Sequence, residues 1–271
     1  PEILLSILKD EHDFCVDLQN AIRPMFILGD ELLTRADAAH ITKLIVQIMA
    51  RYPNFDLADW NGFNILHNSA SSVGALDLGF KPQNGSMSCS DMIKAFDAQQ
   101  LKLLYLINAD DIDIKRTSHG FIIYQGHHGS KGANIADVVL PSPAYTEKDA
   151  IYVNLEGRAQ KAFAAIDPIG LAKYDWQIAL DLAASLSIDL EFSSLSELRR
   201  IMAETSQVFA PENIGHLMNR GAVNISAGLL DNWPADNFSA LKRNYYMTDV
   251  ISSASINMAN CIKYKLSEKV A

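Results

Sequence analysis

Two short apolar runs, residues 121–124 and 136–140, are separated by a single short loop, and this spacing restricts the fold more than any other sequence feature. Continuous apolar runs of this length are typical of strands in a parallel sheet that is buried on both faces. A crossover between parallel strands needs about 10–12 residues, so this connection is near the lower limit. We therefore expect two consecutive strands of a parallel sheet, with the loop at its carboxyl edge.

Other apolar patterns in the first half of the chain predict the rest of this sheet and the helices around it. Apolar runs at residues 25–29 and 101–107 predict two more strands, which a long helical crossover would make a parallel pair. Five side chains follow the spacing of one helix face: Ile41, Leu44, Ile45, Ile48 and Met49. Further helices are expected at residues 1–9 and 64–75, and the polar segment 81–90 is expected to be an exposed loop. The fold class predicted is α/β, with a parallel sheet flanked by helices.

The second half of the chain has a different pattern. Residues 151–155 alternate between apolar and polar side chains, which predicts a strand with one buried face. Helices are expected around residues 176–183 and, with Thr248 and Asp249 as a cap, around residues 251–258.

Between these two helices, Ser194 and Glu197 have the spacing of a capping box, which predicts the start of another helix. Residues 209–234 lack periodicity and are expected to be irregular. The patterns therefore predict that residues 1–160 are part of an α/β domain, and that residues 161–271 are a helical and irregular carboxyl-terminal extension packing on it.

The overall composition disfavours several classes of partner and site. The net charge is −9 and the isoelectric point about 5.2, so binding to the phosphate backbone of nucleic acids is not expected. No apolar run approaches the ~18 residues of a membrane-spanning helix, so no direct membrane insertion is expected. Cys15, Cys89 and Cys261 are far apart and form no C-x-x-C pair, so neither a disulfide framework nor a cysteine-bound metal or cluster is predicted. The chain begins at Pro1, with no methionine and no targeting signal, and runs straight into an apolar-periodic segment. We therefore expect a processed, split or truncated product that begins inside a domain.

The loop after residues 121–124 contains the candidate site residues Gly126, His127, His128, Gly129 and Gly132. Ligands bind at this edge in open parallel sheets, so the loop could form a backbone nest for phosphate, or supply imidazole ligands to a metal. However, it has neither the G-x-G-x-x-G order nor a Walker lysine–hydroxyl pair, and adjacent histidines on an extended segment point to opposite sides. We therefore favour a structural turn or a subunit contact over ligand binding.

The strand at residues 151–155 is bracketed by two carboxylates, Glu147 and Glu156, which suggests a pair for acid–base catalysis. Nine residues of extended chain would separate them by tens of ångströms, so the sequence does not imply that they pair. Glu156 and Arg158, which flank Gly157, are expected to make local turn and ion-pair contacts. No G-x-S-x-G motif is present, and the sequence predicts no catalytic residue and no metal ligand.

Three consecutive motifs resemble the signature of the molybdopterin oxidoreductase superfamily: ADVVLP at 136–141, YTEK at 145–148 and N-x-E-G-R-x-Q at 154–160. Four further segments are similar to the carboxyl-terminal part of the large iron–sulfur subunit of respiratory complex I, in its mitochondrial and alphaproteobacterial form. They are residues 64–67, 75–82, 122–129 and 246–255. The similar segments extend over nearly the whole chain.

The resemblance implies a molybdopterin-oxidoreductase-like domain that holds no pterin and carries no catalytic residues, in the peripheral arm of NADH:ubiquinone oxidoreductase. FMN and the iron–sulfur clusters are expected elsewhere in that complex. The implied partners are the amino-terminal iron–sulfur portion of the same subunit and other peripheral-arm subunits. The implied location is the matrix side of the mitochondrial inner membrane, or the cytoplasmic face of an alphaproteobacterial membrane.

Two other functions remain open from the sequence. The chain could be a fragment of an active molybdopterin-dependent oxidoreductase, although no run of alternating strands for a cofactor-binding barrel follows Gln160. It could also be a small-ligand-binding α/β module that uses the loop at residues 126–132.

Overall fold

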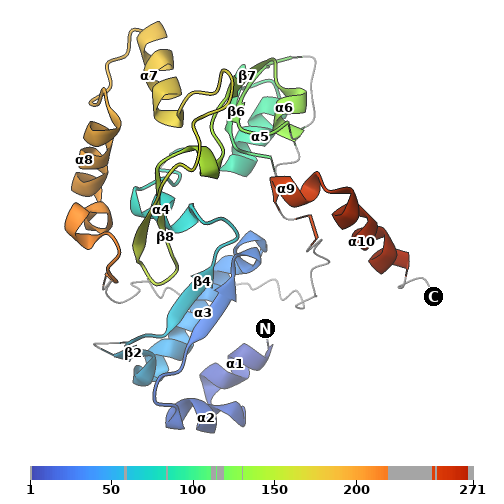
Figure 1. Ribbon diagram of the computed structural model, residues 1–271. Helices are drawn as coiled ribbons and strands as arrows, with labels where there is room; N and C mark the ends of the chain where they lie inside the picture. Colours follow the sequence, from blue (N-terminus) through green and yellow to red (C-terminus); the bar gives the residue numbers. More distant parts are fainter. Residues whose placement is uncertain are drawn as a thin grey trace. The chain divides into compact units, whose positions relative to one another are not determined.

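The computed structural model describes residues 2–57, 60–83, 85–110, 114, 119–129, 131–218, 246–247 and 249–267 (Figure 1). The chain divides into two compact units, and it passes from one to the other several times. Unit 1 comprises residues 1–80, 151–161 and 199–239, and unit 2 comprises residues 81–150, 162–198 and 240–271. The domain boundary after residue 160 stays a prediction.

Unit 1 is built around a pair of parallel strands and a long helix. Its elements up to residue 80 are α1 (Glu2–Lys9), α2 (Phe14–Asn20), β1 (Phe26–Gly29), η1 (Asp30–Thr34), α3 (Ala38–Arg51), η2 (Pro53–Phe55), β2 (Asp56–Leu57), β3 (Trp60–Asn61), β4 (Phe63–Leu66) and α4 (Ser72–Asp77). The parallel pair is β1 and β4, with Phe26 opposite Phe63 and Gly29 opposite Leu66. The short strands β2 and β3 pair in antiparallel orientation.

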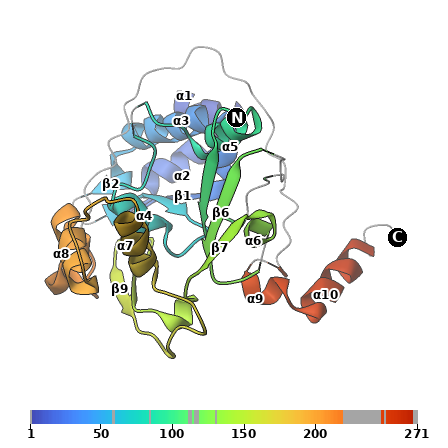
Figure 2. The ribbon, with the colours of Figure 1, turned by 90° about the horizontal axis from the view of Figure 1, so that it is seen from above.

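Helix α3 carries the core of unit 1 on the apolar face that its sequence predicts. Ile48 and Leu44 pack with Ile7 of α1 and with α2, and α3 lies beside α1 in Figure 2. Ile41 and Ile45 instead pack against β1 and β4. Because one helix contributes to both clusters, it joins the amino-terminal helices to the parallel strands.

A partly buried ion pair lies at the start of α3. The Arg35 guanidinium donates from Nε to Asp37 Oδ1 at 2.7 Å and from Nη2 to Oδ2 at 2.8 Å, and Asp37 is 1% exposed. This two-point geometry is the strongest form of a charge-assisted hydrogen bond. The bond to Arg35 lowers the pKa of Asp37, more than burial raises it.

Two sequence predictions in unit 1 were wrong. The helix predicted at residues 64–75 is replaced by strand β4, and helix α4 begins only at Ser72. Pairing with β1, and packing of Phe63 against the core, override the local pattern. The second wrong prediction concerns the partner of β1, which pairs with β4 and not with the strand predicted at residues 101–107.

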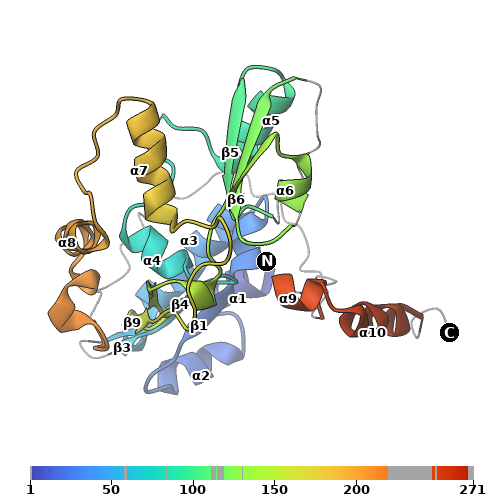
Figure 3. The ribbon, with the colours of Figure 1, turned by 45° about the horizontal axis from the view of Figure 1, so that its top comes forward.

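Unit 2 contains a parallel sheet of three strands in the order β5-β6-β7 (Figure 3). Its elements up to residue 150 are α5 (Cys89–Asp97), β5 (Leu103–Ile107), β6 (Phe121–Gly126), α6 (Lys131–Ile135), β7 (Val138–Pro141) and η3 (Tyr145–Glu147). The prediction that residues 121–124 and 136–140 form parallel strands is confirmed, and α6 lies within their short connection.

One face of this sheet is covered by α5 and α6. Leu104 and Leu106 of β5 and Ile122 and Tyr124 of β6 form a buried cluster with Phe96 of α5. The residues that alternate with these on β5 are exposed, so the prediction of strands buried on both faces was wrong for β5.

After residue 150 the described chain consists mainly of helices and one small sheet. Its elements are β8 (Ala150–Val153), β9 (Ala159–Ala162), α7 (Asp175–Ser185), α8 (Leu195–Thr205), η4 (Gln207–Phe209), η5 (Pro211–Asn213), α9 (Val250–Ser253) and α10 (Ile256–Ser267). Strands β8 and β9 form a two-stranded sheet. Among the described residues, no helix is long and apolar enough to span a membrane.

The predicted helix starts in this region are confirmed in part. Ser194 Oγ accepts from the Glu197 backbone N–H at 3.3 Å, as the predicted box requires, and the Glu197 carboxylate accepts from the Ser193 backbone N–H at 2.6 Å. Asp249 caps the next helix by accepting from Ser252 N at 3.0 Å, whereas Thr248 lies outside the described residues. The single predicted closing helix is divided into α9 and α10. The segment predicted to be irregular, residues 209–234, is described only as far as residue 218. Its described part includes the end of the 3-10 turn η4 and the whole of η5.

Replacing Asp37 with asparagine tests the ion pair between Asp37 and Arg35. Asparagine removes the negative charge that accepts both guanidinium hydrogen bonds, so we expect a lower free energy of unfolding at pH 7. The folded pKa of Asp37 is lowered, so its stabilisation is present above the unfolded pKa of about 3.9 and is lost as the pH falls through the folded pKa. Urea titrations should therefore show wild type and D37N converging below about pH 4.

The matched control is Asp181→Asn, which removes the exposed ion pair between Asp181 and Lys173. Exposed pairs contribute little, so D181N should stay close to wild type throughout. A stability difference between wild type and D37N that is unchanged from neutral to acidic pH would contradict the assignment.

Candidate functional site

The loop after β6 is shaped by the side chain of Tyr124. A Cβ atom on Gly126 would overlap the Tyr124 phenol, and a Cβ atom on Gly132 would lie 2.6 Å from the Tyr124 ring. Gly129, by contrast, has open space around it. Gly126 and Gly132 are therefore required by a buried aromatic ring of the chain itself.

Asp110 fixes the same ring and the same loop. The Tyr124 hydroxyl donates to Asp110 Oδ2 at 2.8 Å, and the backbone N–H of Gly132 donates to Asp110 Oδ1 at 3.2 Å. A phosphate nest needs such backbone N–H groups to point at the ligand. Here the Gly132 N–H already has a carboxylate partner, whose negative charge would also repel a bound anion.

The two histidines of the loop contact each other. Their rings are edge to face with centroids 4.8 Å apart, and the two Nδ1 atoms are 2.5 Å apart. The expectation that they point to opposite sides was wrong, because β6 ends at Gly126 and the chain is no longer extended there. Burial lowers the pKa of His127, and the neighbouring His128 and Lys148 lower it further. The described residues contain no group of three His, Cys, Asp or Glu side chains that could hold a metal ion.

A polar network at the carboxyl end of β5 and β6 is absent from the sequence prediction. Gln125, which is 3% exposed, accepts a short hydrogen bond from the Tyr105 hydroxyl and donates from Nε2 to Asp175 Oδ1 at 2.7 Å. Lys148 Nζ donates to Asp175 Oδ2, also at 2.7 Å. Burial, and then the charge of Asp175, raise the pKa of Tyr105. The signal that could have indicated the network is a glutamine at the end of an otherwise apolar strand.

Glu156 and Arg158 lie in unit 1, in the turn between β8 and β9, whereas the glycine loop lies in unit 2. The turn residue Gly157 has a φ of 91°, which glycine adopts at little cost. Asn154 Oδ1 accepts from the Arg158 backbone N–H at 2.9 Å, and Arg158 Nη1 donates to the carbonyl of Gly215 at 2.7 Å. These contacts hold the turn in place.

Glu147 belongs to unit 2, where its Oε2 accepts from the Ala144 backbone N–H at 3.2 Å. This carboxylate closes the short turn η3, which leads from the sheet towards β8. Its described hydrogen bond is local to the turn.

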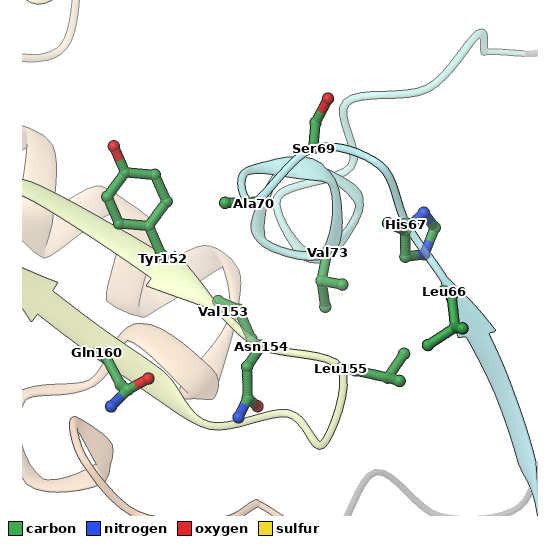
Figure 4. A pocket seen from close by; sticks show the side chains of 10 residues that line it. All are labelled: Leu66, His67, Ser69, Ala70, Val73, Tyr152, Val153, Asn154, Leu155 and Gln160. Carbon is green, nitrogen blue, oxygen red and sulfur yellow. The ribbon is translucent and has the colours of Figure 1, made fainter. Parts of the chain in front are cut away.

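Unit 1 contains a cavity of about 330 Å³ where β4 ends (Figure 4). In Figure 4 the side chains of Val73, His67 and Leu155 surround the central gap, whereas the hydroxyls of Ser69 and Tyr152 point away from it. The full lining is Leu66, His67, Ser69, Ala70, Val73, Tyr152, Val153, Asn154, Leu155 and Gln160. This lining includes neither lysine nor arginine.

Alanine substitutions at two glycines of the loop distinguish a structural turn from a ligand nest. Gly132→Ala places a methyl group against the Tyr124 ring, so we expect a loss of about 1–3 kcal/mol in the free energy of unfolding. Gly129→Ala, the matched control, should change it by no more than about 0.5 kcal/mol, because no atom lies within reach. Urea titration of both variants measures the difference. Equal small effects would contradict a structural role for Gly132.

Two family models match the chain. The model described as molybdopterin oxidoreductase matches residues 1–185. The model described as the carboxyl-terminal region of the NADH-ubiquinone oxidoreductase G subunit matches residues 211–261. Together they account for most of the sequence.

Similar proteins are named as subunits of NADH oxidoreductases. The chain is 41% identical to the NADH-quinone oxidoreductase G subunit of Rickettsia bellii, over 97% of the chain and 36% of that protein. It is 42% identical to the G subunit of Rickettsia felis, over 100% of the chain and 38% of that protein. It is 40% identical to the NADH-ubiquinone oxidoreductase 75 kDa subunit of Reclinomonas americana, over 97% of the chain and 38% of that protein. The chain thus spans little more than a third of these relatives, and the family match over residues 1–185 shows that it belongs to the molybdopterin oxidoreductase family.

Proposed function

We propose that the chain is a non-catalytic structural part of the peripheral, NADH-oxidising arm of respiratory complex I. Similarity to the Rickettsia G subunits and to the Reclinomonas 75 kDa subunit over nearly the whole chain supports this assignment. In this role the chain supports electron transfer from NADH through iron–sulfur clusters to ubiquinone, which is coupled to proton translocation. It acts as a subunit of the oxidoreductase without contributing a reacting group.

The observation that carries the proposal is that side chains of the chain itself occupy the space and the backbone donor of the glycine loop. In parallel sheets the carboxyl edge is where ligands bind. At this edge, the ring of Tyr124 occupies the space beside Gly126 and Gly132, and Asp110 accepts from the Gly132 N–H. The chain therefore supplies its own groups where a cofactor would need free backbone donors.

Two features of the described residues support a chain without the cofactor that the family name implies. A molybdopterin is a phosphate ester, and phosphate sites in proteins are built from Arg or Lys side chains and free backbone N–H groups. The cavity beside β4 has neither Lys nor Arg in its lining, and the Gly132 N–H of the loop faces Asp110. The proposal therefore assigns no pterin to this chain, and no step of a pterin reaction to its residues.

The proposed partners and location follow from the same role. The chain would bind the amino-terminal iron–sulfur portion of the large iron–sulfur subunit, and other peripheral-arm subunits. FMN and the iron–sulfur clusters would be held by those partners. The assembly would stand on the matrix side of the mitochondrial inner membrane, or on the cytoplasmic face of an alphaproteobacterial membrane.

A hybrid subunit tests the proposal. In an alphaproteobacterium, the region of the large iron–sulfur subunit that aligns with this chain is replaced by the chain itself, and NADH:ubiquinone reductase activity is measured in membranes. We expect an active complex, with molybdenum and tungsten each below about 0.1 atom per FMN, since a site lacking ligands does not retain metal. Mass spectrometry of the purified complex measures both metals. Molybdenum or tungsten in stoichiometric amount would instead favour the fragment of an active pterin enzyme.

The histidines of the loop provide a second readout in the same hybrid. Replacing His127 and His128 together with alanine should leave the specific activity within about twofold of the unmodified hybrid, because a non-catalytic chain loses no transition-state contact. The comparison is made per FMN, so that a lower yield of complex does not count as lost activity. A loss of two orders of magnitude or more per FMN would contradict the non-catalytic role.

A further inference from the structure

One face of the three-stranded sheet in unit 2 is apolar and is not covered by the other described residues of that unit, and we call it the open face. It includes six apolar side chains: Leu103, Tyr105 and Ile107 of β5, Phe121 and Ile123 of β6, and Val138 of β7. The strand register places the buried Gln125 and the half-buried Leu140 on the same face. The strand register places Leu103 beside Phe121, and it aligns Ile123 with both Tyr105 and Val138. Ile107, Leu103 and Phe121 are 55%, 51% and 45% exposed.

The open face differs from the opposite face of the same strands. Leu104, Leu106 and Ile122 point to that opposite face, where α5 and α6 bury them. Parallel sheets occur almost only with both faces covered, because their strands are apolar on both sides. A continuous apolar surface of this kind, without a charged side chain among its six members, marks a contact surface.

The polar network closes the carboxyl end of the open face. The Tyr105 hydroxyl is bonded to Gln125, which is itself bonded to Asp175 at the start of α7. Tyr105 thus presents its ring to the open face while its polar end is satisfied. Because these side chains are held in place before a partner arrives, docking costs little additional ordering entropy.

The geometry points to a helix as the occupant. Parallel sheets are covered by helices, whereas two sheets packed face to face are characteristic of antiparallel sandwiches. A strand of five residues such as β5 is about 17 Å long, which matches a helix of about 11 residues. A second copy of this chain would offer another parallel sheet, and so it suits the open face less well.

We propose that the open face binds an amphipathic helix from the part of the large iron–sulfur subunit that this chain does not span. The relatives supply the argument, since the chain aligns with only 36–38% of their length and leaves most of the polypeptide to provide such a helix. The helix would present aliphatic or aromatic side chains at i, i+3, i+4 and i+7. The inference rests on the proposed function for the identity of this partner.

Binding to the remainder of a relative tests the inference. The part of the Rickettsia bellii relative outside the aligned region is expressed as a tagged polypeptide, and the full chain is titrated against it. Ile107→Asp should weaken binding at least about tenfold, because it buries a carboxylate against an apolar helix. Ile188→Asp is the matched control: it is the same substitution in the same unit at a residue 54% exposed but outside the sheet, and it should stay within about twofold.

Cysteine labelling gives a readout that does not depend on the folding of an Asp variant. In a chain with its exposed Cys89 and Cys261 replaced by serine, Ile107→Cys and Ile188→Cys are alkylated with and without the partner polypeptide. Labelling at position 107 should slow at least about tenfold in the complex, while labelling at position 188 should not change.

The possible results separate the open face from the proposed function. If wild type binds and I107D binds equally well, the open face is not the contact, and the proposed function still stands. If protection at position 107 requires only a higher concentration of the chain itself, a second copy is the occupant and the inference is overturned. If wild type does not bind at all, the inference fails, and the failure counts against the subunit role as well.

Discussion

The packing of one aromatic ring against two glycines determines the carboxyl edge of the sheet in unit 2. Tyr124 lies in β6 and its ring packs against the loop, where any side chain at Gly126 or Gly132 would collide with it. Asp110 binds both the phenol and the loop backbone, so strand, loop and α6 are held together at one point. Parallel sheets often bind ligands at this edge, but here the edge is occupied by contacts that stabilise the fold.

The parts of the fold that the sequence predicted are those in which local pattern and tertiary packing agree. The helix face around Ile48 and the strand β6 before the glycine loop are apolar where the core needs them. The helix prediction for residues 64–75 was wrong because short stretches with apolar residues fit a strand or a helix equally well. Contact with the distant strand β1 decides between the two. Helix α5 was not predicted because it begins within a polar stretch, although Ser88 caps it and its sequence is amphipathic.

The candidate site could be located but not interpreted from the sequence. A glycine that makes room for a phosphate and a glycine that makes room for a phenol both appear as the absence of a side chain. The group that distinguishes them is Asp110, which is 22 residues from Gly132 along the chain and has no fixed spacing to a motif. The sequence did not predict the polar network for the same reason, because Gln125 and Asp175 are 50 residues apart along the chain.

The open face also affects how much of the chain persists in a cell. If the open face binds the proposed helix, an unassembled copy would present a band of aliphatic and aromatic side chains of the kind that chaperones retain and proteases recognise. Marginally stable or incompletely assembled proteins are continuously sorted by this machinery, and their abundance follows the fraction that escapes it. Surplus copies would therefore be degraded while assembled copies persist. The alternation of side chains along β5 would in this way couple the amount of the chain to the amount of its partner.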